Sequence, residues 1–205
     1  MKNKIILVGL IALIIFVSSF EKGNEIQEKQ PTLSNKVSLA PTEEESMHRD
    51  FNFPFVGNNF NGFREAVAFK ESQGRYGVVN SLGYLGKYQF GKSTLKRFNI
   101  HNVQEFLNDP ELQEDAFIAL CSLNKWILRK DIKRSVGKRI NGIEVTESGI
   151  LAAAHLAGAG NVKKFLRSQG SHMFTDAFGS SLQYYLRKFS GFNTSFIEQN
   201  KKPIV

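Results

Sequence analysis

The chain has 205 residues, of which 41% are hydrophobic and 22% charged, with a single cysteine and a formal net charge of +8. This length suits one domain or two small ones, and this composition excludes wholesale disorder and a polytopic membrane protein. The lone Cys121 excludes an intramolecular disulfide and a metal site built from cysteines. The positive charge points to an acidic partner such as nucleic acid, a membrane surface or an anionic polymer.

Residues 1–19 have the pattern of a bacterial secretory signal peptide. Lys2 and Lys4 precede thirteen residues, 5–17, that lack polar side chains, and small residues follow. This run is shorter than the ~20 residues of a membrane span. We therefore expect an exported protein, periplasmic or extracellular and associated with the cell wall. An uncleaved signal anchor, which would be the chain's only membrane contact, stays open as the alternative.

Residues 20–50 are predicted to form a flexible tether. From residue 21 onward this stretch has no aromatic residue and no sustained apolar period. It holds seven acidic and four basic side chains, a net charge of −3, while the signal carries +2. The remaining residues, 51–205, therefore carry +9 and are predicted to form one folded domain.

This domain is predicted to be mainly α-helical, because apolar residues recur at helical spacing and no strand alternation is long enough for a large sheet. We expect helices over 63–73, 91–98, 149–157, 162–168 and 181–189, the fourth capped by Asn161. The longest begins at Asp109-Pro110 with one apolar face. That face comprises Leu112, Ala116, Leu120, Leu123 and Ile127. Asn141-Gly142 predicts a small hairpin or a loop over 139–145. Cys121 and Trp126 are interpreted as packing residues.

Glu71 is the strongest candidate for a catalytic residue. Helical spacing places it in line with Phe63 and Val67, and residues 66–69 are all apolar. A carboxyl group in such surroundings loses solvation, which raises its pKa. A carboxylic acid that stays protonated near neutral pH can donate a proton to a leaving-group oxygen. The alternative is a solvated glutamate at a helix end.

A glycine-rich segment, 81–91, follows Glu71. Its glycines let the backbone approach a ligand closely, and Gln89 offers both a donor and an acceptor. Tyr84, Tyr88 and Phe90 offer flat faces on which a sugar ring could stack. An ordinary glycine-rich loop with core aromatics is the alternative.

In this order the motifs resemble lytic transglycosylases of the soluble, goose-lysozyme-like type, over about residues 60–190. Glu71-Ser72 matches their Glu-Ser, and residues 86–89, Gly-Lys-Tyr-Gln, match their Gly-Leu-Met-Gln. Residues 154–162, AHLAGAGNV, are similar to their Ala-Tyr-Asn-Ala-Gly-x-Gly-x-Val. Tyr185-Leu186 resembles their late Tyr-Val pair, although Tyr184 could be the match instead.

The resemblance implies a lysozyme-like helical domain that binds peptidoglycan glycan strands as a monomer, without metal or organic cofactor. Glu71 would cleave the β-1,4 bond between N-acetylmuramic acid (MurNAc) and N-acetylglucosamine (GlcNAc) as the single acid and base, giving 1,6-anhydro products. Tyr185 would position Glu71 or the sugar, and Gln89 would hold the saccharide or support the acid. The expected substrate-binding residues are Ser72, Gly86, Tyr88, Gln89, His155 and Tyr185.

Two departures from the family pattern concern the expected cleft. His155-Leu156 replaces the family's Tyr-Asn, and Leu156 cannot make the hydrogen bonds of an amide. His155 could be a polar cleft residue or a packed histidine. Lys87-Tyr88 stands where the family usually has Leu-Met, so altered contacts with the substrate are expected.

The distribution of acids bears on the reaction. Most glycoside hydrolases use two carboxylates, but residues 72–104 contain no Asp or Glu. This favours a transglycosylase over a hydrolytic muramidase, which stays open because Glu144, Glu147 or Asp176 could approach Glu71. A non-catalytic lysozyme-like module for wall binding or assembly is the third hypothesis. No nucleic-acid partner is expected, since no helix-turn-helix or basic-heptad pattern is present and the chain carries an export signal.

Overall fold

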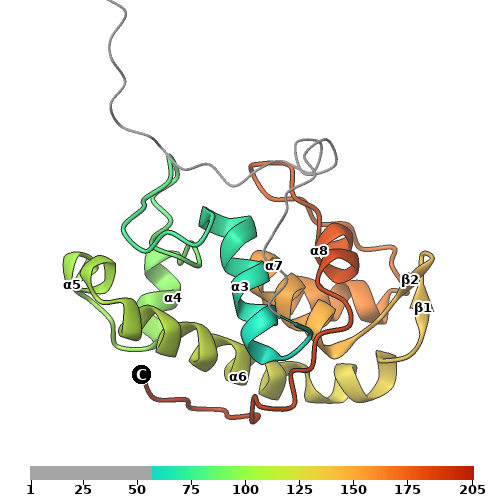
Figure 1. Cartoon of the computed structure of the whole chain (residues 1–205). Coiled ribbons are helices and arrows are strands. Elements are labelled where there is room, and N and C mark those ends of the chain that lie inside the picture. The colour runs from blue at the N-terminus through green and yellow to red at the C-terminus, as the bar shows by residue number, and fades with distance from the viewer. Residues whose placement is uncertain (1–56) are drawn as a thin grey trace, which may run out of the picture. The chain divides into compact units, whose positions relative to one another are not determined.

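The computed structural model describes residues 57–205, which form a mainly helical fold as predicted (Figure 1). The predicted signal peptide, the tether and residues 51–56 lie outside the described part. The described helices are α3 (Phe60–Ser72), α4 (Lys92–Arg97), α5 (Val103–Asn108), α6 (Pro110–Ser135), α7 (Glu147–Arg167) and α8 (Leu182–Lys188). Strands β1 (Arg139–Ile140) and β2 (Ile143–Glu144) form one hairpin.

Helix α3 carries Glu71 into the core of the fold. Its first turn is capped by Asn59, whose side chain accepts a hydrogen bond from the Gly62 amide. It ends where Gln73 takes a left-handed conformation, with φ of 59°. Phe63 and Val67 are fully buried, so the line of residues that leads to Glu71 faces the interior. In Figure 1, α3 stands between α4 and α5 on one side and α7, α8 and the hairpin on the other.

The segment between α3 and α4 is pinned to α6 by a side-chain amide. Gln113 Oε1 accepts a hydrogen bond from the Lys87 amide at 2.8 Å, and its Nε2 donates to the Phe106 carbonyl. Gly86 lies directly against this amide with φ of 72°, and a β-carbon there would overlap Gln113. Glycine is therefore required at position 86 for both backbone and packing reasons.

Helix α6 begins as predicted, and its predicted apolar face packs against the core, but the most deeply buried residues lie only partly on that face. The Asp109 side chain accepts from the Leu112 amide, and Pro110 is the first helical residue. Of the predicted apolar face, only Ala116 and Leu123 are buried, and its other members are partly exposed. The buried face also includes polar Gln113, Asn124 and Asp131. Cys121 is buried, consistent with a packing role.

The hairpin and the break in α7 are confirmed in outline. Arg139 pairs with Glu144 and Ile140 with Ile143, around an Asn141-Gly142 turn. Helix α7 is interrupted at Gly158, whose φ of 75° and ψ of 149° are not helical. The prediction that Asn161 caps the second part is wrong, because that part begins directly after Gly158. The Asn161 amide instead donates to the Ala157 carbonyl.

Phenylalanine side chains fill the interior between the helices. Phe63, Phe117, Phe165 and Phe189 come from four different helices or their ends and are all fully buried. Trp126 is only partly buried, and the cationic groups of Arg129 and Lys201 lie over its ring. Within residues 57–205, no helix combines the length and apolar character needed to span a bilayer.

Candidate active site

Glu71 and Tyr185 meet in the core although 114 residues separate them in the chain. The Tyr185 hydroxyl, from α8, donates a hydrogen bond of 2.7 Å to Glu71 Oε1. Tyr185 is almost completely buried, and 8% of Glu71 is exposed. The bond occupies one carboxyl oxygen and fixes the orientation of the other.

Burial raises the pKa of Glu71 from its ordinary value to about 7. Loss of solvation is the largest cause, and the negative charge of Asp176 adds to it. The Tyr185 hydrogen bond and the positive charge of Lys70 act in the opposite direction. Near neutral pH this carboxyl group is therefore populated in both its protonated and its ionised form.

His155 is a neutral neighbour of this carboxyl group. Its Nε2 lies 2.8 Å from the Tyr88 carbonyl oxygen, to which it donates, and 3.9 Å from Glu71 Oε1. Burial lowers the pKa of His155 to about 4. The imidazole thus brings no positive charge that would ionise Glu71 at neutral pH. Its Nδ1 is an acceptor that has no partner among residues 57–205.

Lys87 and Tyr88 belong to a partly buried ionic cluster around Glu114. Glu114 accepts hydrogen bonds from the Tyr88 hydroxyl at 2.6 Å, the Tyr76 hydroxyl at 2.7 Å and Lys87 Nζ at 2.7 Å. Lys87 Nζ also bonds Glu65 at 2.7 Å. These donors hold the pKa of Glu114 below its usual range despite its burial.

The expectation that Tyr88 offers a face to a sugar is corrected by its burial. Its ring is 0% exposed and stacks on Phe117 at a centroid distance of 4.1 Å. Phe90 is buried as well. Tyr88 acts on the site through its backbone carbonyl, which holds His155. Of the three aromatic residues in the segment, Tyr84 is the one with an accessible ring, at 42% exposed.

Ser72 and Gly86 hold the glycine-rich segment in place, and Gln89 lines the hollow described below. The Ser72 hydroxyl donates to the Lys87 carbonyl at 2.7 Å. Gln89, with φ of 50°, donates from Nε2 to the Gly86 carbonyl. Its Oε1 is left buried and without a partner within the described residues.

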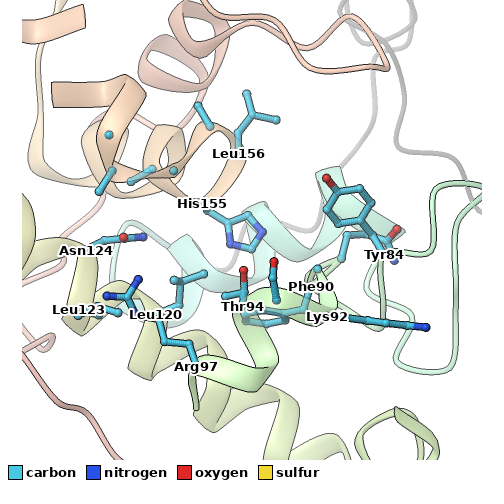
Figure 2. A pocket seen from close by; sticks show the side chains of 18 of the residues that line it. Tyr84, Phe90, Lys92, Thr94, Arg97, Leu120, Leu123, Asn124, His155 and Leu156 are labelled. Atoms are coloured by element: carbon cyan, nitrogen blue, oxygen red, sulfur yellow. The ribbon is translucent and has the colours of Figure 1, made fainter. Parts of the chain in front are cut away.

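A hollow of about 1070 Å³ lies between the glycine-rich segment, α4, α6 and α7. Figure 2 shows the His155 ring projecting into it, with Thr94 and Arg97 on one side and Asn124 on another. Gln89, Tyr84 and Leu156 also line it. Glu71 is not one of its lining residues, but its Oε1 lies 3.9 Å from Nε2 of His155, which is. The polar wall residues Thr94, Arg97 and Asn124 were not predicted. Only Asn124 carries a sequence signal, as an amide beside the apolar face of α6.

Comparisons with protein-family models, with curated proteins and with solved structures find no match for this chain. Among residues 57–205, no group of three or more His, Cys, Asp or Glu side chains is arranged to hold a metal ion.

Proposed function

We propose that this chain is a peptidoglycan lytic transglycosylase with a lysozyme-like domain, exported to the periplasm or the cell wall. It would cleave the β-1,4 bond between MurNAc and GlcNAc, with Glu71 as the acid and then the base. The observation that carries this proposal is the buried Tyr185–Glu71 hydrogen bond, next to His155 in the wall of a large hollow. This arrangement gives one carboxyl group a pKa of about 7, which suits both roles.

The reaction would proceed in two proton transfers. Protonated Glu71 gives its proton to the glycosidic oxygen as the bond to C1 of MurNAc breaks. The resulting carboxylate takes the proton from the 6-hydroxyl of the same sugar, whose oxygen bonds C1 and closes the 1,6-anhydro ring. Glu71 returns to its protonated form, so no second carboxylate and no cofactor is needed.

The surroundings of Glu71 support this cycle. A cationic neighbour in hydrogen-bond contact would keep the group ionised and prevent the first step. His155 is uncharged near neutral pH, and Tyr185 is a neutral donor. Tyr185 can also stabilise the carboxylate that forms after the first transfer. Gln89 Oε1 and His155 Nδ1 are acceptors at the hollow without a partner in residues 57–205, and they suit hydroxyl or amide donors of a saccharide.

Asp176 supports a second candidate, hydrolysis by a muramidase. Of the three acids considered from the sequence, Asp176 is the one whose charge contributes to the raised pKa of Glu71. Its carboxylate accepts hydrogen bonds from the Phe178 and Ser180 amides. If Asp176 activates water, Asp176→Asn should abolish turnover. The transglycosylase proposal expects the variant to keep cutting the glycan.

Digestion of purified sacculi tests the catalytic role. Wild-type protein should release soluble fragments, and Glu71→Gln should release none while retaining the fold. Glu105→Gln, which changes an exposed acid on α5, is the matched control and should act like wild type. Release by Glu71→Gln at the wild-type rate would refute the proposal. Sedimentation with sacculi without release by the wild type would instead support a non-catalytic wall-binding module.

A further inference from the structure

The positive charge of the domain is concentrated in one part of the chain. Residues 125–170 hold ten basic and three acidic side chains, a net charge of +7. The other described residues hold eleven basic and nine acidic side chains, a net charge of only +2. This region comprises the second half of α6, the hairpin and α7, and Figure 1 shows the end of α6 leading into the hairpin.

A buried carboxylate joins the ends of α6 and α7 inside this region. Asp131, on α6, accepts hydrogen bonds from Arg134 on the same helix and from Arg167 Nε on α7, the latter at 2.9 Å. Asp131 is buried, while the two arginine side chains are 57% and 56% exposed. The aspartate therefore holds both guanidinium groups at the surface, where they keep N–H donors for a ligand.

The basic side chains continue the two helix walls of the hollow. On α6, Lys130 and Arg134 follow the wall residues Leu123 and Ile127 at helical spacing. On α7, the wall residue Gly160 is followed in the same way by Lys163, Lys164 and Arg167. The Asp131–Arg167 bond shows that the two helices are still in contact at this point. We name these five side chains the basic rim: Lys130, Arg134, Lys163, Lys164 and Arg167.

The described residues leave most of the rim without counter-charges. Lys130, Lys163 and Lys164 have no ion pair within residues 57–205, and Lys130 and Lys164 are exposed. A neutral saccharide would gain no binding energy from the five positive charges of the basic rim. An anionic substituent on the same strand gains Coulomb energy and directed hydrogen bonds.

We propose that the basic rim binds the carboxylates of peptides attached to the glycan strand, so that the preferred substrate is peptide-bearing rather than stripped glycan. This inference rests on the proposed function for the identity of the strand. The rim is assigned to acidic peptide substituents because its residues follow the wall residues of the hollow at helical spacing on both α6 and α7, although Lys130 also lines a second hollow. A surface for membrane lipid or a soluble polyanion would not need that continuity.

The test compares two charge-reversal variants of the full chain on two substrates. Lys130→Glu/Lys164→Glu changes the rim, and Lys188→Glu/Lys202→Glu makes the same charge change at exposed positions elsewhere. The substrates are glycan strands with their peptides and strands stripped by an amidase. Sedimentation with the strands and the rate of fragment release are both measured.

The rim variant should lose about tenfold in binding and in kcat/KM on peptide-bearing strands, the low end of electrostatic steering effects. It should match the wild type on stripped strands, and the control variant should match the wild type on both. An equal loss on both strands, or no loss, would overturn the inference. So would loss of binding to anionic phospholipid vesicles with unchanged binding to strands. Because binding needs no turnover, an inactive wild type would refute the proposed function alone.

Discussion

Glu71 is held in an environment that stabilises its protonated form at the expense of its ionised form. Its pKa is about 7 in the folded chain, against an ordinary value of 4.5. The stability associated with this group is therefore fully present below pH 4.5 and is lost as the pH rises through 7. A carboxyl group in this state suits proton transfer, and it weakens the fold in alkaline solution.

Glu71→Gln should therefore stabilise the domain at alkaline pH. The neutral amide avoids the cost of a buried charge, so the free energy of unfolding should rise by about 3 kcal/mol at pH 8.5, as expected for a pKa raised from 4.5 to about 7. At pH 5 most of this gain should vanish. Urea unfolding at the two pH values measures the gain in free energy of unfolding. The same gain at both pH values would contradict the raised pKa of Glu71.

Tyr185→Phe should shift the pH dependence of the reaction. The tyrosine hydroxyl donates to Glu71 and so lowers the pKa of that carboxyl group. Removing it should raise this pKa above 7 and move the alkaline limb of the kcat/KM profile to higher pH, together with a lower kcat. Tyr184→Phe is the control, because the pKa of Glu71 does not depend on a Tyr184 hydrogen bond. A lower rate with an unmoved limb would mean that Tyr185 only supports the fold.

At the scale of elements, the break in α7 depends on one glycine. Gly158 has φ of 75° and ψ of 149°, a region that residues with a β-carbon scarcely populate. A β-carbon added at this position would meet no packing neighbour within 4 Å, so the requirement comes from the backbone alone. The break exposes residues 156–160 along the hollow, where they form part of its wall.

Gly158→Ala should lower the free energy of unfolding by about 1–3 kcal/mol, the usual cost of such backbone strain. Gly160→Ala is the matched control, since Gly160 is helical and has equal space around it. Alanine there should stabilise the domain by roughly 0.5–1 kcal/mol. Thermal unfolding of both variants measures these changes in the free energy of unfolding. Equal changes at the two positions would show that the backbone of α7 does not require glycine at 158.

The sequence predicted five of the six helices in residues 57–205 and missed features that depend on tertiary contacts. Asp109-Pro110, the Asn141-Gly142 turn and the glycine break in α7 are local signals, and each prediction was confirmed. The six-residue α5 was missed because it is too short to show a period. The buried face of α6 was predicted only in part, because Gln113 and Asp131 are also buried, by partners from distant segments.

The candidate site was predictable only in part, for the same reason. Glu71 was singled out by the apolar residues on its own helix, which a sequence displays. The residues around Tyr88 do not show that Glu114, 26 residues away, accepts a hydrogen bond from its hydroxyl and helps to keep its ring buried. His155 fits both of its interpretations, since it is buried against aromatic rings and also lines the hollow.

For the molecule as a whole, several buried groups favour stability in a limited pH range. The pKa of His155 is lowered to about 4 by burial, and partners lower the pKa of Asp131 and Glu114 despite their burial. Each contributes stability that is present above its unfolded pKa and is lost as the pH falls through its folded pKa.

The thermal midpoint should therefore change little between about pH 4.5 and 6.5, because two buried groups act in opposite directions there. Glu71 loses its contribution as the pH rises from 4.5 to about 7, and His155 loses its contribution as the pH falls from 6.5 to about 4. Calorimetry from pH 3 to 9 measures the profile. In Glu71→Gln the opposing contribution of Glu71 is absent, so the midpoint of this variant should rise from pH 4.5 to 6.5. A profile as flat as that of the wild type would contradict the burial assigned to Glu71.

The mass of the fragments released from sacculi tests the central claim most directly. The wild type should leave MurNAc ends as 1,6-anhydro sugars, lighter by one water than hydrolytic ends, and Glu71→Gln should leave none. Fragments with hydrated ends, lost in Asp176→Asn, would contradict the single-carboxylate mechanism and establish a hydrolase in its place.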